Sequence, residues 1–389
     1  MRLDGVRVLD LTRLLPGPYA TQLLADAGAD VIKIEDTDAG DYARHMPPTT
    51  DEGVGAVFDA VNRGKRSVAL DLKADRGREA FLALASDADV VIESFRPGVT
   101  ERLGVDYDSV TERCPDVVYC SLTGYGQNGP YADRAGHDLN YVGLAGLLDM
   151  TRESTDEAPR APGYQIADMA GGLLAAFSVC SALLSRELGN TGGEYLDVSM
   201  TDAVVSFGQA IAPQALGGSD PRPGETPFTG EYPCYDVYEA KDGRYVTLGA
   251  LEPKFFDAFC AAVGRPELAD EHMASDRAVR AALRTELESI FGERTRDEWV
   301  EFLSDVDTAF GGVYTPAESV EHPQVDARGF IHRPDDGSPR VGFPVRGPEV
   351  RDRNDGDLPR HGEHTEALLE SAGYDPADIE ELRSDGVIL

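Results

Sequence analysis

Positive charge is scarce in this sequence. Lysine and arginine together number 36, against 70 aspartate and glutamate residues, and the formal net charge of the 389 residues is −34. Only five of the cations are lysines. Proteins that bind nucleic acid or anionic lipid surfaces need cationic contacts with phosphate groups. The charge balance therefore argues against nucleic acid and against membranes as partners.

Paired cysteines and long apolar segments are also missing. No apolar run reaches the roughly 20 residues of a membrane-spanning helix, and the N-terminus lacks the features of a secretory signal. The five cysteines, at positions 114, 120, 180, 234 and 260, are scattered without C-x-x-C spacing. We therefore expect free thiols in a cytoplasmic protein, with no disulfide and no metal site.

Acidic residues are what the sequence has in excess. They are interleaved with regular apolar patterning, and 41% of the residues are hydrophobic, so a sizeable core is available. We interpret the excess acid as a surface adapted to concentrated salt, in which many carboxylates keep a protein in solution. This interpretation predicts that activity is lost in low salt.

Strands and helices are predicted to alternate over the first half of the chain. The predicted strands are residues 6–11, 30–35, 67–72, 89–93, 116–122 and 194–198, and the helices are 19–27, 76–85, 99–103 and 168–188. This alternation is typical of an α/β protein with a parallel, doubly wound, Rossmann-like sheet. The longest helix is almost entirely small or apolar, so we expect it to be buried, with Asp168 at its N-cap.

Composition also predicts a second, smaller domain. Residues 1–211 are expected to form the large nucleotide-fold domain, and the Pro- and Gly-rich residues 212–234 a linker. A predicted hairpin at 235–249 followed by helices indicates a small α+β domain over 235–320. Residues 321–389 are expected to return and complete the large domain.

The densest polar chemistry lies in Ala135–Tyr141. It follows a turn, Gly124–Gly129, that matches G-x-G-x-x-G but precedes Pro130 and comes after a late strand, so we reject dinucleotide binding. We expect this turn to let the backbone pass close to a ligand. Taken alone, His137 is better explained as a cap of the following helix, and Glu252 as the acidic first turn of another.

Motifs spread over nearly the whole chain favour a functional role for His137 and Glu252 over these structural explanations. They include Leu15–Pro18, Asn62–Arg66, Phe95–Leu103, Ala135–Tyr141, Ala167–Gly172 and Gly249–Pro253. On these motifs the chain resembles the family III CoA-transferase (CaiB/BaiF) superfamily. Ala135–Tyr141 and Gly249–Pro253 most closely resemble its α-methylacyl-CoA racemase branch.

The resemblance implies an enzyme that epimerises the α-carbon of a 2-methylacyl-CoA. His137 and Asp168 would flank that carbon, one removing the proton and the other returning it. Free N–H groups at the start of the Asp168 helix would hold the enolate oxygen. Glu252, from the partner subunit of an interlocked homodimer, would orient the histidine.

The same resemblance implies that CoA lies on the large domain as part of the substrate, with no tightly bound cofactor. Guanidinium and ammonium groups suit its phosphates, and two further side chains match positions that line the CoA channel. The residues expected to contact CoA are Arg63, Lys65, Arg66, Arg96, Asp138 and Tyr141.

The transferase branch of the family provides the alternative. There the aspartate that matches Asp168 is a nucleophile that forms an aspartyl-CoA thioester. His137 favours a racemase, because transferases usually carry another residue there. Gly224–Pro233 and Asp307–Pro316, however, depart from the racemase pattern beside the acyl pocket. A transferase that moves CoA from succinyl-CoA to a dicarboxylate such as mesaconate is therefore the alternative, and a non-catalytic CoA-binding protein is disfavoured.

Overall fold

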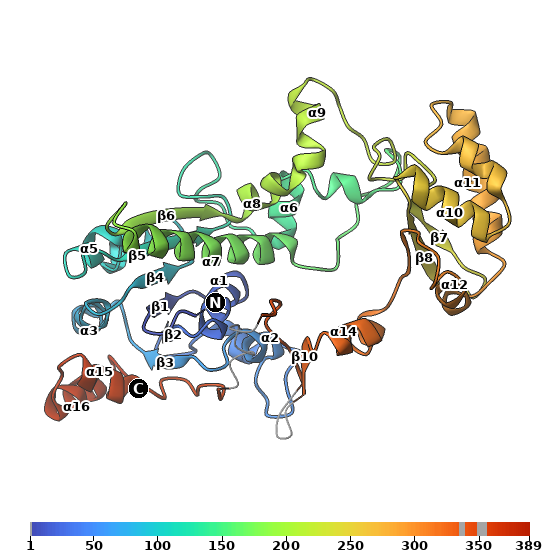
Figure 1. The fold of residues 1–389 in the computed structure, drawn as a ribbon. Coiled ribbons are helices and arrows are strands. Elements are labelled where there is room, and N and C mark those ends of the chain that lie inside the picture. Colours follow the sequence, from blue (N-terminus) through green and yellow to red (C-terminus); the bar gives the residue numbers. More distant parts are fainter. Residues whose placement is uncertain (1, 334–338, 348–355) are drawn as a thin grey trace. The chain divides into compact units, whose positions relative to one another are not determined.

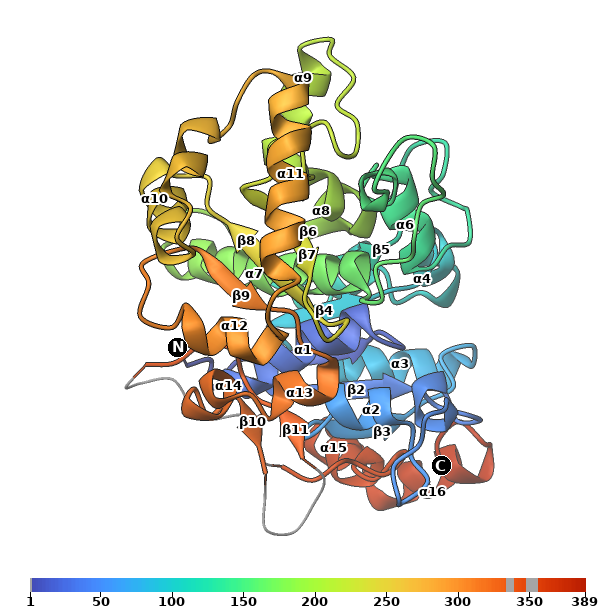
Figure 2. The same ribbon diagram turned by 90° about the vertical axis from the view of Figure 1, so that its right-hand side faces the viewer.

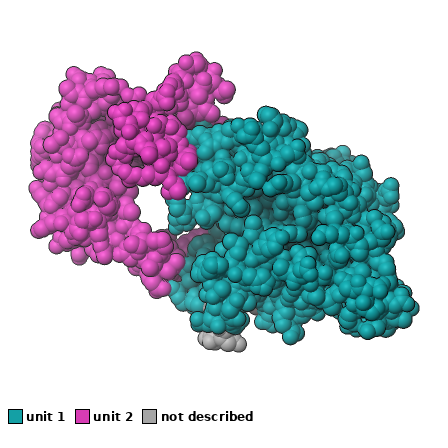
Figure 3. Space-filling view, turned by 180° about the vertical axis from the view of Figure 1, so that it is seen from behind, with its two compact units in different colours: residues 1–147, 162–208, 329–389 teal, residues 148–161, 209–328 magenta. Residues whose placement is uncertain are grey.

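The computed structural model describes residues 2–333, 339–347 and 356–389, which form two compact units (Figure 3). Unit 1 comprises Met1–Leu147, Pro162–Gly208 and Gly329–Leu389, and unit 2 comprises Leu148–Ala161 and Gln209–Arg328. The chain thus leaves unit 1 twice and returns to it. The short excursion into unit 2 was not expected from the sequence.

Unit 1 is built on a six-stranded parallel sheet in the order β3-β2-β1-β4-β5-β6 (Figure 1). The strands are β1 Arg7–Leu11, β2 Asp30–Glu35, β3 Arg66–Ala69, β4 Val90–Glu93, β5 Val118–Thr123 and β6 Glu194–Ser199. The predicted doubly wound α/β class is confirmed. The strand order reverses between β1 and β4, and open sheets of this kind bind ligands beyond the C-terminal ends of the strands at such a point.

Helices lie between successive strands of this sheet, and a last one follows β6. They are α1 Pro16–Asp26, α2 Ala56–Val61, α3 Asp75–Ala85, α4 Val99–Leu103, α5 Tyr107–Thr111, α6 Asp138–Leu144, α7 Ile166–Glu187 and α8 Met200–Phe207. α1 begins three residues earlier than the sequence predicted, at Pro16. Proline is tolerated in the first turn of a helix, where its missing N–H group has no partner in any case.

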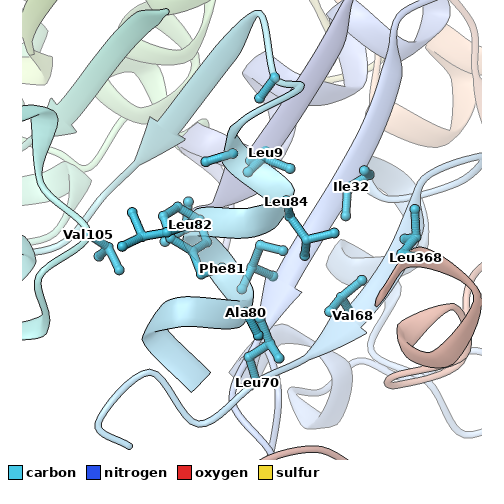
Figure 4. Close-up of a cluster of buried hydrophobic side chains, with 14 of the residues drawn as sticks. Leu9, Ile32, Val68, Leu70, Ala80, Phe81, Leu82, Leu84, Val105 and Leu368 are labelled. Carbon is cyan, nitrogen blue, oxygen red and sulfur yellow. The ribbon is translucent and has the colours of Figure 1, made fainter. Parts of the chain in front are cut away.

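The C-terminal segment completes the core of unit 1 (Figure 4). Helices α15 (Thr365–Ser371) and α16 (Pro376–Ser384) contribute Leu368 and Ile379 to a buried cluster that includes Leu9, Ile32 and Phe81. A backbone bridge joins Leu70 to Ile388. The end of the chain is therefore held to the sheet by apolar packing and by backbone hydrogen bonds.

Helix α7 is only partly buried. Two glycines allow close packing, because a Cβ on Gly172 would lie 2.4 Å from the Pro16 carbonyl oxygen and one on Gly171 would lie 2.5 Å from Met200 Cγ. Among the described residues, α7 is the one helix with the length and mean hydropathy, 1.7, of a membrane span, and half of that window is buried in the fold. We identify it as a core helix. The prediction of full burial was wrong, because one face exposes Leu173, Phe177, Leu184 and Leu188.

Unit 2 contains a three-stranded antiparallel sheet, and Figure 2 shows α11 alongside β7. Its main elements are β7 Tyr235–Glu239, β8 Tyr245–Gly249, β9 Phe310–Gly312, α10 Pro253–Ala262, α11 Arg277–Phe291 and α12 Arg296–Phe302. The predicted hairpin is β7–β8. Trp299 is fully buried in the core of this unit, where its Nε1–H donates to the Phe291 carbonyl oxygen at 2.8 Å.

Shorter elements complete the chain. In unit 2 they are α9 Ala212–Leu216, α13 Pro316–Val320 and α14 Pro323–Ala327, and in unit 1 the two-residue strands β10 Ile331–His332 and β11 Arg340–Val341. Helix α9 lies inside the segment expected to be a linker, and α16 was not predicted. Both are short helices without the long apolar periodicity that identifies a helix from sequence.

Candidate active site

A pocket of about 370 Å³ lies in unit 1 where the strand order of the sheet reverses. Its lining comes from the segments that follow β1, β4 and β5 and from the starts of α6, α7 and α8. The structure brings His137, Asp168, Tyr141 and Arg96 together in this pocket. These residues are up to 72 positions apart in the sequence, and the parallel sheet is what places them at one edge.

His137 occupies the N-cap position of α6, in agreement with the prediction that it caps the helix that follows it. Its backbone N–H donates to Asn140 Oδ1 at 3.0 Å, which accounts for the amide in the motif. Its side chain also lines the pocket. The two roles are compatible, because the backbone of His137 forms the cap and leaves the imidazole available to a substrate.

Asp168 is the third residue of α7, and Gln165 takes the N-cap position predicted for it. The helix start is capped from outside by Asp138, the first residue of α6. Its Oδ1 accepts the N–H groups of Ala167 at 2.6 Å and of Asp168 at 3.1 Å. The N–H groups expected to hold an enolate oxygen are therefore already bonded, and Asp138 has a structural contact where a CoA contact was predicted.

The carboxyl group of Asp168 has a shifted pKa. Burial is the main cause and the charge of Asp138 the second, and together they raise the pKa of Asp168 to about 7. Both effects disfavour the ionised form. Near neutral pH this carboxyl group is therefore divided between its two protonation states, so it can accept or donate a proton, and as a carboxylate it is poorly solvated.

The ring of Tyr141 explains why two positions beside the pocket are glycines. Its O–H donates to the Gly136 carbonyl oxygen at 2.6 Å, and burial, with the charge of Asp168, raises its pKa to about 12. A Cβ on Gly124 would lie 2.3 Å from the Tyr141 ring, and one on Gly136 would lie 2.6 Å from it. The glycine-rich turn therefore passes close to a tyrosine ring, whereas a close approach to a ligand was expected from the sequence.

The predicted basic cluster does not present free cations. Lys65 is fully buried, and its Nζ donates to Asp10 Oδ2 at 3.2 Å, Thr21 Oγ1 at 2.7 Å and Asn62 Oδ1 at 2.9 Å. Burial lowers the pKa of Lys65 to about 8. An ammonium group in this position stabilises the fold and does not reach a ligand at the surface.

The two arginines near Lys65 in the sequence are also paired with carboxylates. Arg63, two residues beyond the end of α2, pairs with Asp59 of that helix. Arg66 pairs with Asp30, and because these residues begin β3 and β2, the pair lies at the N-terminal edge of the sheet. The pocket lies at the opposite edge, so this pair is poorly placed to contact a ligand there.

Two pocket arginines were not identified from the sequence. The Arg13 guanidinium lies 5.4 Å from the ring centroid of Tyr42 and 5.3 Å from that of Phe95, and its nearest carboxylate, on Asp36, is 3.9 Å away. Arg134 stacks on Tyr131 at 3.8 Å. Within the described part of the chain, neither Arg96 nor Arg134 forms an ion pair. The position of Arg13 directly after the first strand was the available signal.

A second pocket, of about 730 Å³, adjoins the first at the C-terminal ends of β1, β2 and β3. The two pockets share Arg13, Tyr42 and Phe95. Leu11, Ile34 and Leu70 contribute apolar surface to the second pocket, and Asp36 and Lys73 contribute charge. An apolar floor with a charged rim suits a ligand that has a flat ring and polar substituents.

Glu93 is a further buried carboxyl group, and it was not identified from the sequence. Burial raises its pKa to about 7, and its Oε2 accepts the N–H of Phe95 at 2.7 Å. It therefore shapes the segment that carries Phe95 and Arg96 into the pocket. Among the described residues, no cluster of three or more histidine, cysteine or acidic side chains is arranged to hold a metal ion.

Glu252 belongs to unit 2, where it precedes α10 with its side chain exposed. Its role as a partner of His137 therefore stays a prediction.

Comparisons with known proteins agree with this architecture. The model of CoA-transferase family III matches residues 3–365. A succinyl-CoA:mesaconate CoA-transferase of Haloarcula marismortui is 36% identical, over 96% of this chain and 97% of its own. The α-methylacyl-CoA racemase of Homo sapiens is 32% identical, over 100% and 98%. A crystal structure of a CaiB/BaiF family protein from Brucella suis has a TM-score of 0.82 at 33% identity, covering 95% of this chain and 99% of that chain.

The likeness to racemases is thus no closer than the likeness to transferases. Most of the relatives at this level of identity are named CoA-transferases. Both branches act on thioesters of CoA, and both are similar to this chain over almost its whole length. The chain belongs to CoA-transferase family III, the CaiB/BaiF family.

Proposed function

We propose that the protein is a CoA-transferase that moves CoA from one carboxylic acid to another, with a dicarboxylate among its substrates. The observation that carries this proposal is the composition of the pocket. Arg96 and Arg134 line it together with Asp168 and form no ion pair with a described residue. A transferase must hold a free carboxylate beside its nucleophile, whereas the alkyl thioester of a racemase brings no such charge.

In this proposal Asp168 is the nucleophile. Its carboxylate attacks the thioester carbonyl, and CoA leaves as a thiolate with formation of a mixed anhydride. The thiolate then attacks the side-chain carbonyl carbon of Asp168 in this anhydride. This step releases the first acid and leaves an aspartyl-CoA thioester. The second acid takes CoA by the reverse of these steps. Burial of Asp168 supports this role, because a poorly solvated carboxylate is a better nucleophile.

We place the two ends of CoA in the two adjoining pockets. The adenine ring would occupy the second pocket, over the apolar surface of Leu11 and Leu70. The thioester would lie in the first pocket, beside Asp168. Arg13, which lines both pockets, is suited to a phosphate group between these ends. Lys65 has no role in this arrangement.

The second candidate is a racemase of 2-methylacyl-CoA, the activity expected from the sequence motifs. His137 and Asp168 line the same pocket, as two bases on opposite faces of an α-carbon would require. The pKa of about 7 of Asp168 also suits a group that both donates and accepts protons. The pocket arginines that form no ion pair with a described residue favour the transferase, and the names of most relatives support the same order of the two candidates.

One pair of assays distinguishes the two activities. In the first, the protein is incubated with succinyl-CoA and free mesaconate or glutarate; we expect CoA to move to the free acid. In the second, it is incubated in heavy water with a 2-methylacyl-CoA; we expect no deuterium at the α-carbon. Deuterium incorporation without CoA transfer would overturn the proposal in favour of the racemase.

The nucleophile can be identified directly. With succinyl-CoA alone, the intact-protein mass should rise by one CoA moiety, with the adduct on Asp168. Asp168→Asn should form no adduct and should retain CoA binding. His137→Ala is the matched control, because a transferase should keep most of its adduct formation whereas a racemase should lose proton exchange.

We further infer a homodimer and a salt-adapted, cytoplasmic protein. The exposed apolar stripe of α7, Leu173, Phe177, Leu184 and Leu188, supports burial against a second copy. The net charge of −34 supports adaptation to salt. Light scattering in molar salt should give twice the chain mass of 41.9 kDa, and dilution into low salt should reduce activity. A monomer at all salt concentrations would contradict the first inference.

A further inference from the structure

The loop that carries Arg13 is held by side chains from four different positions in unit 1. The N–H of Thr12 donates to Asp10 Oδ1 at 2.9 Å, and Lys33 Nζ donates to the carbonyl oxygen of Thr12 at 2.8 Å. The N–H of Arg13 donates to Ser94 Oγ at 3.3 Å. The N–H of the next residue, Leu14, donates to Asp41 Oδ1 at 3.1 Å. Consecutive backbone groups of one loop are thus bonded by side chains and not by the backbone.

Leu14 itself adopts an unfavourable backbone conformation. Its φ of +67° is in the left-handed region, and among the described residues only Met273 shares this property without being a glycine. A branched side chain in this region is strained, and such strain persists only where the surroundings determine the backbone. The hydrogen bond from Leu14 to Asp41 is part of that determination.

Lys33 and Asp41 form the centre of this arrangement. Their side chains are fully buried and lie 2.9 Å apart. Burial alone would lower the pKa of Lys33, but the charges of Asp10 and Asp41 outweigh it and the net shift is upward, so the ammonium group stays charged. The pair lies beneath the loop that carries Arg13.

Asp41 also fixes a second residue of the CoA site. Its Oδ1 accepts the N–H of Ala43 at 3.0 Å, which caps the short helix η1 (Tyr42–His45). Tyr42 is the ring against which the Arg13 guanidinium lies, and both residues line the two pockets. One carboxylate therefore sets the positions of both the arginine and its aromatic neighbour.

We propose that Lys33 and Asp41 are positioning residues for the CoA site. They hold the loop after β1 in a strained conformation, and this directs the Arg13 guanidinium between Tyr42 and Phe95, ready to bind an anion. A buried ion pair is a poor source of stability, because apolar residues of similar volume often stabilise as much. Its contribution here is preorganisation of a cation, which lowers the cost of binding. The proposal rests on the proposed function in one respect, that the anion belongs to CoA.

The first test needs no ligand. Lys33→Met combined with Asp41→Asn removes both charges and leaves no unpaired buried charge, so the variant should fold. Hydrogen exchange should accelerate at least tenfold at the amides of residues 12–14 and stay unchanged in β5. The control is Arg186→Met with Asp89→Asn, which removes a pair near the opposite edge of the sheet. Unchanged exchange at residues 12–14 in the test variant would overturn the proposal.

The second test measures binding of coenzyme A by calorimetry in a double-mutant cycle. Arg13→Ala should weaken binding about tenfold, and Lys33→Met/Asp41→Asn should weaken it by a similar factor. The combined variant should bind no more weakly than Arg13→Ala, because the pair acts through this arginine. Additive losses, or wild-type affinity in the pair variant, would overturn the positioning role. If the wild-type protein binds no coenzyme A, the proposed function fails, and hydrogen exchange alone then decides the positioning role.

Discussion

Two sets of cations in unit 1 differ in how sequence and structure arrange them. Arg63, Lys65 and Arg66 are neighbours in the sequence, yet each faces an aspartate, and Lys65 is fully buried. A second set is spread over 122 positions and converges on one pocket. That set is Arg13, Arg96 and Arg134. In a chain with 70 acidic residues, whether a carboxylate lies opposite a cation matters more than how many cations are adjacent in sequence.

The edges of the sheet explain this difference. Arg66 begins β3 and meets Asp30, which begins β2, so both lie at the edge away from the ligand. Arg13 and Arg96 follow the C-terminal ends of β1 and β4, between which the strand order reverses. Parallel strands place every such C-terminal residue at one edge of the sheet.

The largest effect is expected for Lys65, and it tests whether this residue stabilises the fold or binds a ligand. Lys65→Met should lower the free energy of unfolding by about 3–5 kcal/mol, because it leaves Asp10 buried beside a single remaining cation. Urea denaturation measures this change. A variant that is fully stable but no longer binds coenzyme A would show that Lys65 belongs to the ligand-binding set after all.

Arg96 should show the opposite behaviour. Arg96→Ala should weaken binding of an acyl-CoA or of a carboxylate substrate by about 1.5–3 kcal/mol, the range for a hydrogen bond to a charged group. Because Arg96 has no ion pair within the described residues, its loss should leave the melting temperature nearly unchanged. Steady-state kinetics and thermal denaturation of the same preparation check both statements, and Arg102→Ala, on the adjacent helix, is a control.

The comparison of paired and unpaired charges also applies to Asp168, whose charged neighbour, Asp138, carries the same sign of charge. The pKa of Asp168, about 7, means that the carboxylate fraction falls as the pH drops through 7. A nucleophilic carboxylate therefore predicts that kcat/KM falls below that pH. Asp138→Asn removes a charge that raises the pKa, so the pKa of Asp168 falls and the acid limb should move to lower pH. A limb that moves upward or not at all would contradict this assignment.

The smallest effect is expected at Arg66. Arg66→Ala removes a partly exposed pair with Asp30, and such pairs contribute about 0–1 kcal/mol. The free energy of unfolding should change by no more than this, and the affinity for coenzyme A should not change. A loss of affinity comparable to that of Arg96→Ala would return Arg66 to the ligand-binding set.

Much of unit 1 was predictable from local patterns. The boundaries of β2 and α4 match the prediction residue for residue. β2 is a short, mostly apolar run, and α4 lies between two glycines, Gly98 and Gly104. The errors occur where tertiary contacts override local rules. Asp168 was assigned to the N-cap of α7, but Asp138 from α6 caps that helix, and no local pattern links these two residues.

Some residues of the candidate site could be identified from local motifs, and others only from the tertiary structure. His137, Asp168 and Arg96 were identified because each lies in a motif that resembles a known family. Arg134 was missed because nothing in its immediate sequence distinguishes it from the other arginines, and Arg13 was missed although it follows the first predicted strand. The glycine-rich turn was recognised as a close approach, but its partner, Tyr141, could be found only by placing the ring.

The sequence by itself determined the class of the fold and the family, because these depend on periodicity and on motifs that are local in the chain. Only the tertiary structure decided which charges are available to a ligand. Charge pairing depends on distances of a few ångströms between residues that are separated in the sequence, by 8 positions for Lys33 and Asp41 and by 55 for Lys65 and Asp10. The same physics that buries those cations leaves Arg96 and Arg134 facing the pocket.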